Sequence, residues 1–228
     1  AFRYQTVCQT NRIACQREVD RTQGIIFQNQ PLAVERATYG EANKEHMGDD
    51  FPIYANLAEQ AIALAKPVDV HLYLRFTEKD LPELLDRIDK YGRPGEKKFL
   101  EDPQYLSHLI RLHEDYFSGC KDVRVITIDA TKRAFRKDEE DKSYLQEVIS
   151  DVVGQVRSAM ALPRFPLYHW NVIDHNTAQN AEHRGRVQLR QYLQKTQKIL
   201  SFAGLVSSGK TGLAALVSRE LEIGLSLE

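Results

Sequence analysis

The chain has few cysteines, no excess of charge of either sign and only one tryptophan. Its three cysteines, Cys8, Cys15 and Cys120, are odd in number and lack the CxxC spacing of a metal site. Reduced thiols, as is usual inside cells, are therefore expected. The formal net charge of −1 gives no support for a nucleic-acid or membrane-surface partner.

Long apolar runs are also missing, and none approaches the length that a membrane span needs. No secretory signal is recognised where the sequence opens, so we expect a cytoplasmic protein without a membrane partner. Hydrophobic residues make up 42% of the 228 residues and charged residues 28%, as is usual in globular proteins. The length favours one domain of ordinary size.

The most informative motif that is present lies at residues 204–211, which read GLVSSGKT and fit the P-loop pattern G-x-x-x-x-G-K-[ST]. The glycines let successive N–H groups point inward at a phosphate, and the following helix adds its positive end. Lys210 is expected to reach the β- and γ-phosphates, and Thr211 to ligate Mg²⁺. The predicted ATP-binding residues are Gly204, Ser207, Ser208, Gly209, Lys210 and Thr211.

Short apolar segments alternate with amphipathic ones, which is typical of an α/β protein with a parallel sheet. Strands are predicted over Pro31–Arg36, Val70–Arg75, Arg124–Asp129 and Ile199–Ala203, with a fifth over Leu225–Glu228. Helices are predicted over Phe2–Val19, Phe51–Ala65, Leu81–Lys90, Pro103–Phe117, Lys142–Ala161 and Lys210–Leu221. The expected fold is a P-loop kinase-like three-layer sandwich around a central parallel sheet of about five strands. Phosphate ligands would lie at the carboxyl ends of these strands.

Residues 163–197 differ from the rest because they are polar and contain His169, His175 and His183. The spacings between these histidines fit no familiar set of metal ligands. A connector, helical from about Glu182, is favoured instead. We expect residues 1–162 and 198–228 to form one domain, joined by this connector.

Five segments between residues 2 and 129 form a pattern that is informative when they are taken together. Phe2–Gln16 places Gln5 and Arg12 seven residues apart, and residues 34–39 read VERATY. Residues 71–96 join a strand to an arginine-bearing stretch, residues 105–117 read YLSHLIRLHEDYF, and Val125–Asp129 ends a strand. In this order they resemble the substrate helix, the strand-end [DE]-R-S motif, the lid, the helix after the lid and the last strand of the deoxynucleoside kinase family.

The order of these segments is unusual for that family, in which the P-loop comes first and not last. A circular permutation would explain the order, with residues 163–197 bridging the old termini, since domain termini often lie close together. The strand that ends in the P-loop is then expected beside Pro31–Arg36, so that both end at one crevice. A family segment that precedes the substrate helix has no counterpart here.

The resemblance implies which residues bind the substrate. Gln5 and Arg12 share one face of a helix, and an amide offers both a donor and an acceptor to a base edge. Arg12 with Glu41 would form the family's arginine–acid pair beneath the base, which favours deoxycytidine or a purine deoxynucleoside over thymidine. Glu96 resembles the lid glutamate that meets the sugar 3′-hydroxyl.

The resemblance also implies catalytic residues. Arg36 would hold the transferring phosphoryl group, and Glu35 would orient Mg²⁺ or its waters. Arg87 and Arg93 would close over the reaction and neutralise its developing charge. Glu228 would take the proton of the 5′-hydroxyl, as a positioned carboxylate can.

We therefore expect an enzyme that uses ATP and Mg²⁺ to phosphorylate the 5′-hydroxyl of a deoxynucleoside, acting as a homodimer without a nucleic-acid partner. Two alternatives stay open. One is a nucleoside-monophosphate kinase, which would need further arginines near the substrate helix, where Arg3 and Arg17 stand. The other is a nucleotide-binding module that does not catalyse.

Overall fold

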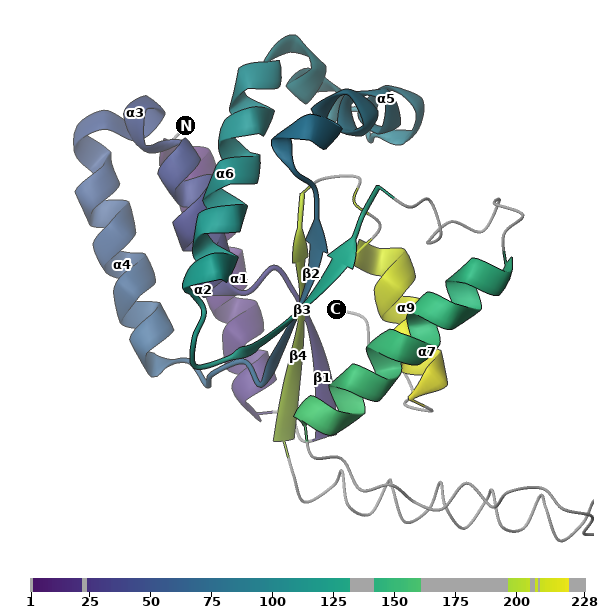
Figure 1. Cartoon of the computed structure of the whole chain (residues 1–228). Coiled ribbons are helices and arrows are strands. Elements are labelled where there is room, and N and C mark those ends of the chain that lie inside the picture. Colours follow the sequence, from purple (N-terminus) through teal and green to yellow (C-terminus); the bar gives the residue numbers. More distant parts are fainter. Residues whose placement is uncertain are drawn as a thin grey trace, which may run out of the picture.

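A computed structural model of the chain describes residues 2–21, 24–131, 142–160, 197–205, 208 and 210–221. In this part a four-stranded parallel sheet lies between two layers of helices (Figure 1). The chain thus has the expected three-layer α/β fold of P-loop kinases, with four strands in the described residues where about five were predicted. The predicted fifth strand, Leu225–Glu228, lies outside the described residues, as does nearly all of the predicted connector.

The last of the described strands occupies the middle of the sheet. The strands are β1 (Gly24–Asn29), β2 (Val70–Arg75), β3 (Arg124–Asp129) and β4 (Gln197–Gly204), in the spatial order β1-β4-β2-β3. Asn29 pairs with Phe202, and Val70 pairs with Leu200. The P-loop strand therefore lies between two strands from the first third of the chain, and its neighbour β1 ends just before Pro31–Arg36, the segment beside which it was predicted.

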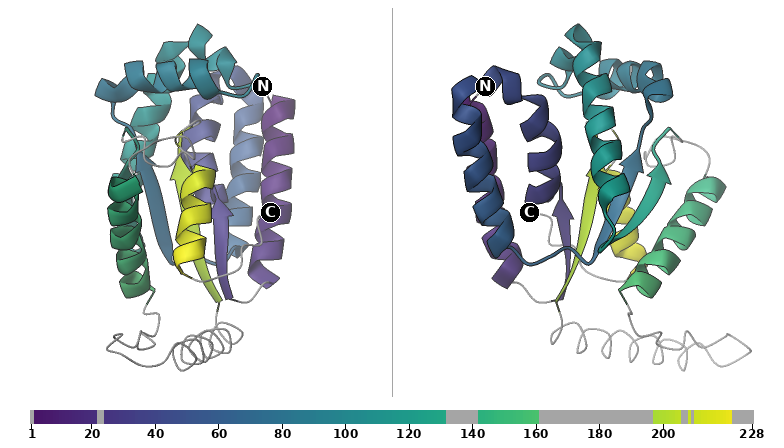
Figure 2. Two further views of the ribbon diagram at one scale, coloured as in Figure 1. Left: turned by 90° about the vertical axis from the view of Figure 1, so that its right-hand side faces the viewer. Right: turned by 60° about the vertical axis from the view of Figure 1, so that its left-hand side comes forward.

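Helices cover both faces of the sheet, as the side views show (Figure 2). One face carries α1 (Phe2–Arg21), α2 (Leu32–Glu35), α4 (Phe51–Leu64) and α6 (Pro103–Gly119), and the other carries α7 (Lys142–Ala159) and α9 (Lys210–Glu220). The helix α5 (Leu81–Tyr91) lies above the carboxyl ends of the strands. Shorter elements are the π-helical turn Arg36–Gly40, α3 (Lys44–Met47) and the 3₁₀ turns Gly48–Asp50, Glu78–Asp80 and Lys97–Glu101. None of the described helices is long and apolar enough to cross a membrane.

The prediction of a strand over Pro31–Arg36 is wrong. The strand at this point is Gly24–Asn29, and Pro31, with a φ of −54°, begins the short helix α2. Proline suits a helix start because its ring fixes φ and the first N–H groups have no helical partner. Leu32 and Val34 are buried. The apolar residues of this segment therefore pack in the core as part of a helix and do not belong to a strand of the sheet.

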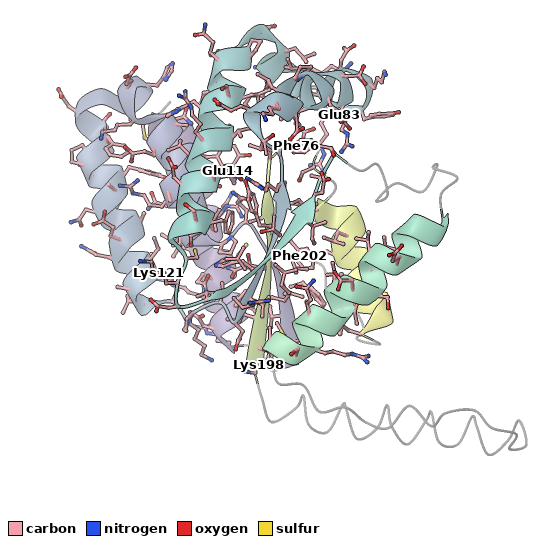
Figure 3. The ribbon with its side chains drawn as sticks, viewed as in Figure 1. Phe76, Glu83, Glu114, Lys121, Lys198 and Phe202 are labelled. Atoms are coloured by element: carbon pink, nitrogen blue, oxygen red, sulfur yellow. The ribbon has the colours of Figure 1, made fainter. Side chains whose placement is uncertain are left out.

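Two polar contacts fix the register of β4 against β2. Asp69, just before β2, accepts hydrogen bonds from Ile199 N at 2.7 Å and from Lys198 Nζ at 2.9 Å. Further along, His71 and Ser201 are hydrogen-bonded at 2.8 Å inside the sheet. Figure 3 shows Lys198 at the lower end of β4 and Phe202 nearer its carboxyl end. Burial of a side chain such as Phe202 contributes about 1.5–3 kcal/mol, so the strand that leads to the P-loop is firmly held.

Candidate functional site

The P-loop begins with a glycine that no other residue can replace. Gly204 has a φ of +148°, and a Cβ built on it would lie 2.8 Å from Leu74 O and 3.1 Å from Ser208 Oγ. Only glycine combines that φ with so close an approach of the neighbouring strand. Ser208 is buried, and its Oγ has no hydrogen-bond partner among the described residues. The loop therefore turns tightly off the end of β4 and keeps a buried hydroxyl next to it.

Lys210 is the first residue of α9 and turns back over the loop. Its Nζ donates to Gly204 O at 3.1 Å and to Leu205 O at 2.7 Å. The pKa of Lys210 is lowered to about 8, chiefly by burial; Glu96 opposes this lowering, and Arg12 and Arg93 add to it. A bound phosphate would offer this amine a charged acceptor in place of two carbonyl oxygens.

Three charged residues from two distant segments act on Lys210. Arg12 comes from α1, and Arg93 and Glu96 come from the lid between α5 and the turn Lys97–Glu101; all three act on its pKa. Within the lid, Arg93 N donates to Glu96 Oε2 at 3.0 Å. The substrate-helix arginine, the lid and the P-loop lysine are thus gathered at the carboxyl ends of β1 and β4. We call this place the strand-end site, and it comprises Arg12, Gln30, Glu35, Tyr39, Arg93, Glu96, His113 and Lys210.

The acid that faces Arg12 is Glu35. Arg12 Nε lies 3.4 Å from Glu35 Oε2, and Arg12 Nη1 donates to Asn29 O and Gln30 O at 2.8 Å each. Burial raises the pKa of Glu35, and Arg12 partly offsets this rise. Arg12 therefore joins α1 both to the end of β1 and to α2.

The expected pair of Arg12 with Glu41 does not form. Glu41 accepts instead from Arg36 Nη1 at 3.0 Å and from Lys44 Nζ at 3.2 Å. Arg36 and Glu41 are brought together because a π-helical turn, Arg36–Gly40, separates them. Such a turn places residues five apart above each other.

The end of β1 does not carry the expected acidic and arginine residues. It carries Gln28 and Asn29, followed by Gln30 in a conformation with a φ of +52°. Glu35 and Arg36, assigned to this motif from the sequence, lie beyond the strand, at the end of α2 and the start of the π-helical turn. The strand end therefore presents amides where a carboxylate and a guanidinium were predicted.

Two predicted catalytic arginines are held elsewhere. Arg36 Nη2 lies 3.7 Å from Glu59 Oε1 on α4, and Arg36 Cζ lies 5.0 Å from the centroid of the Phe51 ring. Arg36 is not among the charges that shift the pKa of Lys210. Its predicted contact with the phosphoryl group stays a prediction. Its Nε is buried without a hydrogen-bond partner among the described residues.

Arg87 is buried beneath the lid and fixes α5 in place. It donates to Ala130 O at 2.5 Å, to Thr131 O and to Glu83 Oε1 at 2.7 Å, and it stacks over Phe76 at 5.4 Å. Figure 3 shows Phe76 and Glu83 beside α5 at the carboxyl end of the sheet. These contacts tie α5 to the residues that follow β3, and the predicted contact of Arg87 with the phosphoryl group stays a prediction.

Several predicted residues cannot be placed. Ser207, Gly209 and Glu228 lie outside the described residues, and so do the side chains of Gln5 and Thr211. The backbone of Gln5 lies in α1 and that of Thr211 in α9, as predicted. Their roles stay predictions.

The sequence did not predict the aromatic cluster of Tyr39, Tyr73 and His113, two members of which belong to the strand-end site. The His113 ring stacks on Tyr73 at 6.3 Å and meets the edge of Tyr39 at 5.8 Å. Burial lowers the pKa of His113 to about 4, whereas burial and the nearby Glu35 raise the pKa of Tyr39. The histidine lies in the predicted helix over 103–117, but its buried position gave no sequence signal.

Of the two residues expected to hold Mg²⁺, Glu35 can be placed, whereas the side chain of Thr211 lies outside the described residues. Magnesium in kinases is usually held by one or two carboxylates together with substrate phosphates. The Glu35 carboxylate is buried against Arg12, and no group of three or more potential ligands is found among the described residues.

Comparison with known proteins identifies one family. The family model described as deoxynucleoside kinase matches residues 1–154. No curated protein and no solved structure gave a significant match. The matched range includes α1, the lid and β3, whereas the P-loop lies beyond it.

Proposed function

The chain belongs to the deoxynucleoside kinase family, and we propose on this premise that it transfers the γ-phosphate of ATP to the 5′-hydroxyl of a deoxynucleoside. The observation that carries the proposal is that Arg12, Arg93 and Glu96 lie near enough to Lys210 for their charges to shift its pKa. These four residues come from the P-loop, the substrate helix and the lid, which are the three parts that phosphoryl transfer to a nucleoside needs. Arg12, Arg93 and Glu96 are each separated from the P-loop by more than a hundred residues of sequence.

In the proposed reaction Lys210 holds the β- and γ-phosphates, and Arg93 neutralises charge that develops on the transferring group. The 5′-oxygen attacks the γ-phosphorus, the bond to the bridging oxygen of ADP breaks, and the hydroxyl proton passes to a carboxylate. Glu228 remains the predicted base. Mg²⁺, when bound with ATP, would supply further neutralisation of the phosphates, with Thr211 as its predicted protein ligand.

On the base side we propose that Arg12 with Glu35 takes the part first assigned to Arg12 with Glu41. A carboxylate beside the base accepts a hydrogen bond from an exocyclic amino group. Thymine presents an oxygen acceptor at that position, and two buried acceptors facing each other are unfavourable. Deoxycytidine and the purine deoxynucleosides are therefore favoured, as the sequence indicated.

We also propose a homodimer. Large apolar side chains are exposed on the adjacent helices α1 and α4, namely Val7 at 58%, Ile53 at 55% and Leu57 at 46%. Exposed apolar surface of this kind favours association. A second copy of the chain would cover it.

The test is turnover with ATP, Mg²⁺ and each of the four deoxynucleosides. Lys210→Ala is expected to lower turnover by at least about a hundredfold while the fold is retained. Lys121→Ala is the matched control, because Lys121 is exposed and lies before β3, at the far end of the sheet (Figure 3). Near-normal activity of folded Lys210→Ala would refute the kinase proposal, and thymidine as the fastest substrate would refute the assignment of Arg12 and Glu35.

A further inference from the structure

Gln30 occupies a strained and central position in the strand-end site. It is 4% exposed and has a φ of +52°, which residues other than glycine rarely adopt. Its N–H donates to Phe202 O on β4 at 2.9 Å, and its carbonyl oxygen accepts from Arg12 at 2.8 Å. Strained backbone of this kind is maintained by its surroundings and is concentrated at functional sites. Gln30 therefore connects the P-loop strand directly to the substrate helix.

His113 determines which way the Gln30 amide points. His113 Nδ1 lies 2.8 Å from Leu109 O, which can only accept, so Nδ1 carries the proton. Burial lowers the pKa of His113 to about 4, so at neutral pH its Nε2 is an unprotonated acceptor. Gln30 Nε2 lies 3.5 Å from this nitrogen and is the donor of a long contact. The reverse amide orientation would set two acceptors against each other.

This orientation leaves Gln30 Oε1 directed away from His113, and the oxygen is buried without a hydrogen-bond partner among the described residues. A buried acceptor with no donor is unfavourable, so its persistence points to a donor that a ligand brings. The residue stands between Arg12 on the base side and the P-loop strand on the phosphate side. The part of a nucleoside that lies between its base and the γ-phosphate is the 5′-hydroxyl.

We propose that Gln30 Oε1 accepts a hydrogen bond from the 5′-hydroxyl and thereby selects nucleosides over nucleoside monophosphates. This inference rests on the proposed function and narrows it. A hydroxyl donates to an amide oxygen, whereas a phosphate dianion presents acceptors that the amide oxygen repels. The amide takes no proton; it holds the hydroxyl before transfer, and during transfer the O–H turns to the catalytic carboxylate and gives it the proton. Gln30 is thus a positioning residue that determines the class of acceptor.

The test is equilibrium binding of 2′-deoxyadenosine, 2′,5′-dideoxyadenosine and 2′-deoxyadenosine 5′-monophosphate to the full chain, measured by calorimetry. The wild type is expected to bind deoxyadenosine about tenfold more tightly than the analogue that lacks the 5′-hydroxyl. Gln30→Met, which keeps the length of the side chain but has no acceptor, is expected to abolish this difference. The same variant should bind the monophosphate no more weakly than the wild type does.

Gln28→Met is the matched control. Gln28 Nε2 donates to Gln16 Oε1 at 2.7 Å, and Gln28 Oε1, like Gln30 Oε1, is buried without a hydrogen-bond partner among the described residues. It is two residues further from the strand end, a rise of about 7 Å, so its replacement should leave the discrimination intact. Should Gln30→Met fail to fold by circular dichroism, Gln30→Asn, which keeps the amide but withdraws its oxygen, is expected to reduce the difference.

Each outcome bears on one of the two proposals. Equal wild-type affinity for deoxyadenosine and its 5′-deoxy analogue would overturn the role of Gln30. A Gln30→Met variant whose affinities for deoxyadenosine and for the 5′-deoxy analogue fall by the same factor would also overturn it. If the wild type still phosphorylates deoxyadenosine in these cases, the proposed function is retained and only the role of Gln30 is rejected. A wild type that neither binds nor phosphorylates any deoxynucleoside would overturn both.

Discussion

The pKa of Lys210 makes nucleotide affinity depend on pH in a direction that the structure determines. Burial lowers this pKa to about 8 in the free protein, where the amine donates to Gly204 O and Leu205 O. Only the protonated amine can form a charge-assisted hydrogen bond to a phosphate. In the complex the adjacent phosphates raise the pKa and keep the ammonium charged. Binding therefore requires proton uptake once the pH exceeds the pKa of the free protein.

The size of the effect follows from the fraction of Lys210 that is protonated beforehand. With a pKa of about 8, roughly three-quarters of the molecules carry the proton at about pH 7.5 and roughly 3% at about pH 9.5. ATP affinity should therefore fall by about twenty-five-fold over this range. The number of protons taken up on binding should rise from about a quarter to nearly one.

Calorimetry of ATP binding in pairs of buffers with different ionisation enthalpies measures both quantities at once. Lys210→Arg provides the control, because arginine stays charged throughout this range, and its affinity for ATP should vary little. The reasoning is refuted if wild-type affinity changes by less than about twofold, or if Lys210→Arg shows the same fall as the wild type.

Three further predictions concern the loop, the proposed dimer and the core. Gly204→Ala should destabilise the protein by about 1–3 kcal/mol and abolish ATP binding, because the added Cβ would lie 2.8 Å from Leu74 O. Gly154→Ala, whose Cβ meets nothing within 4 Å, should do neither in thermal melts and titrations. Leu57→Glu should convert the homodimer into monomers in light scattering, and a wild type that is already monomeric would contradict the dimer. Since burial lowers the pKa of His113 from 6.5 to about 4, stability should fall by about 3 kcal/mol as the pH drops through this interval, and urea titrations of His113→Gln should show a smaller fall.

The sequence predicted the bounds of two strands correctly. Val70–Arg75 is buried at its first five residues, because a strand inside a parallel sheet covered by helices forms a short, nearly continuous apolar run. Arg124–Asp129 lies at an edge of the described sheet, where Ile126 and Ile128 are buried and Thr127 is exposed, and it still has the predicted bounds. Gly24–Asn29 was missed because it has only three apolar residues before two amides. One of these amides, Gln28, is buried through its partner Gln16, a contact between residues twelve apart that no local pattern reveals.

The site was predictable where one motif or one resemblance named the residue, as for Lys210, Arg12 and Glu96. It was not predictable where the pairing of side chains depends on a local distortion. The π-helical turn Arg36–Gly40 brings Arg36 to Glu41 and leaves Glu35 to Arg12. An ordinary helix would align residues three and four apart instead. The sequence shows the charges but gives no sign of the wider turn.

The distribution of charge at the strand-end site favours one polyanion beside a neutral acceptor. On the phosphate side, the charges of Arg93 and Glu96 both act on the pKa of Lys210. On the acceptor side, Arg12 already donates to two carbonyl oxygens and pairs with Glu35. A second phosphate brought by a nucleoside monophosphate would have to break these contacts, and then to approach an amide oxygen and a buried carboxylate. A hydroxyl needs no such rearrangement, so the arrangement supports a kinase of nucleosides over a kinase of their monophosphates.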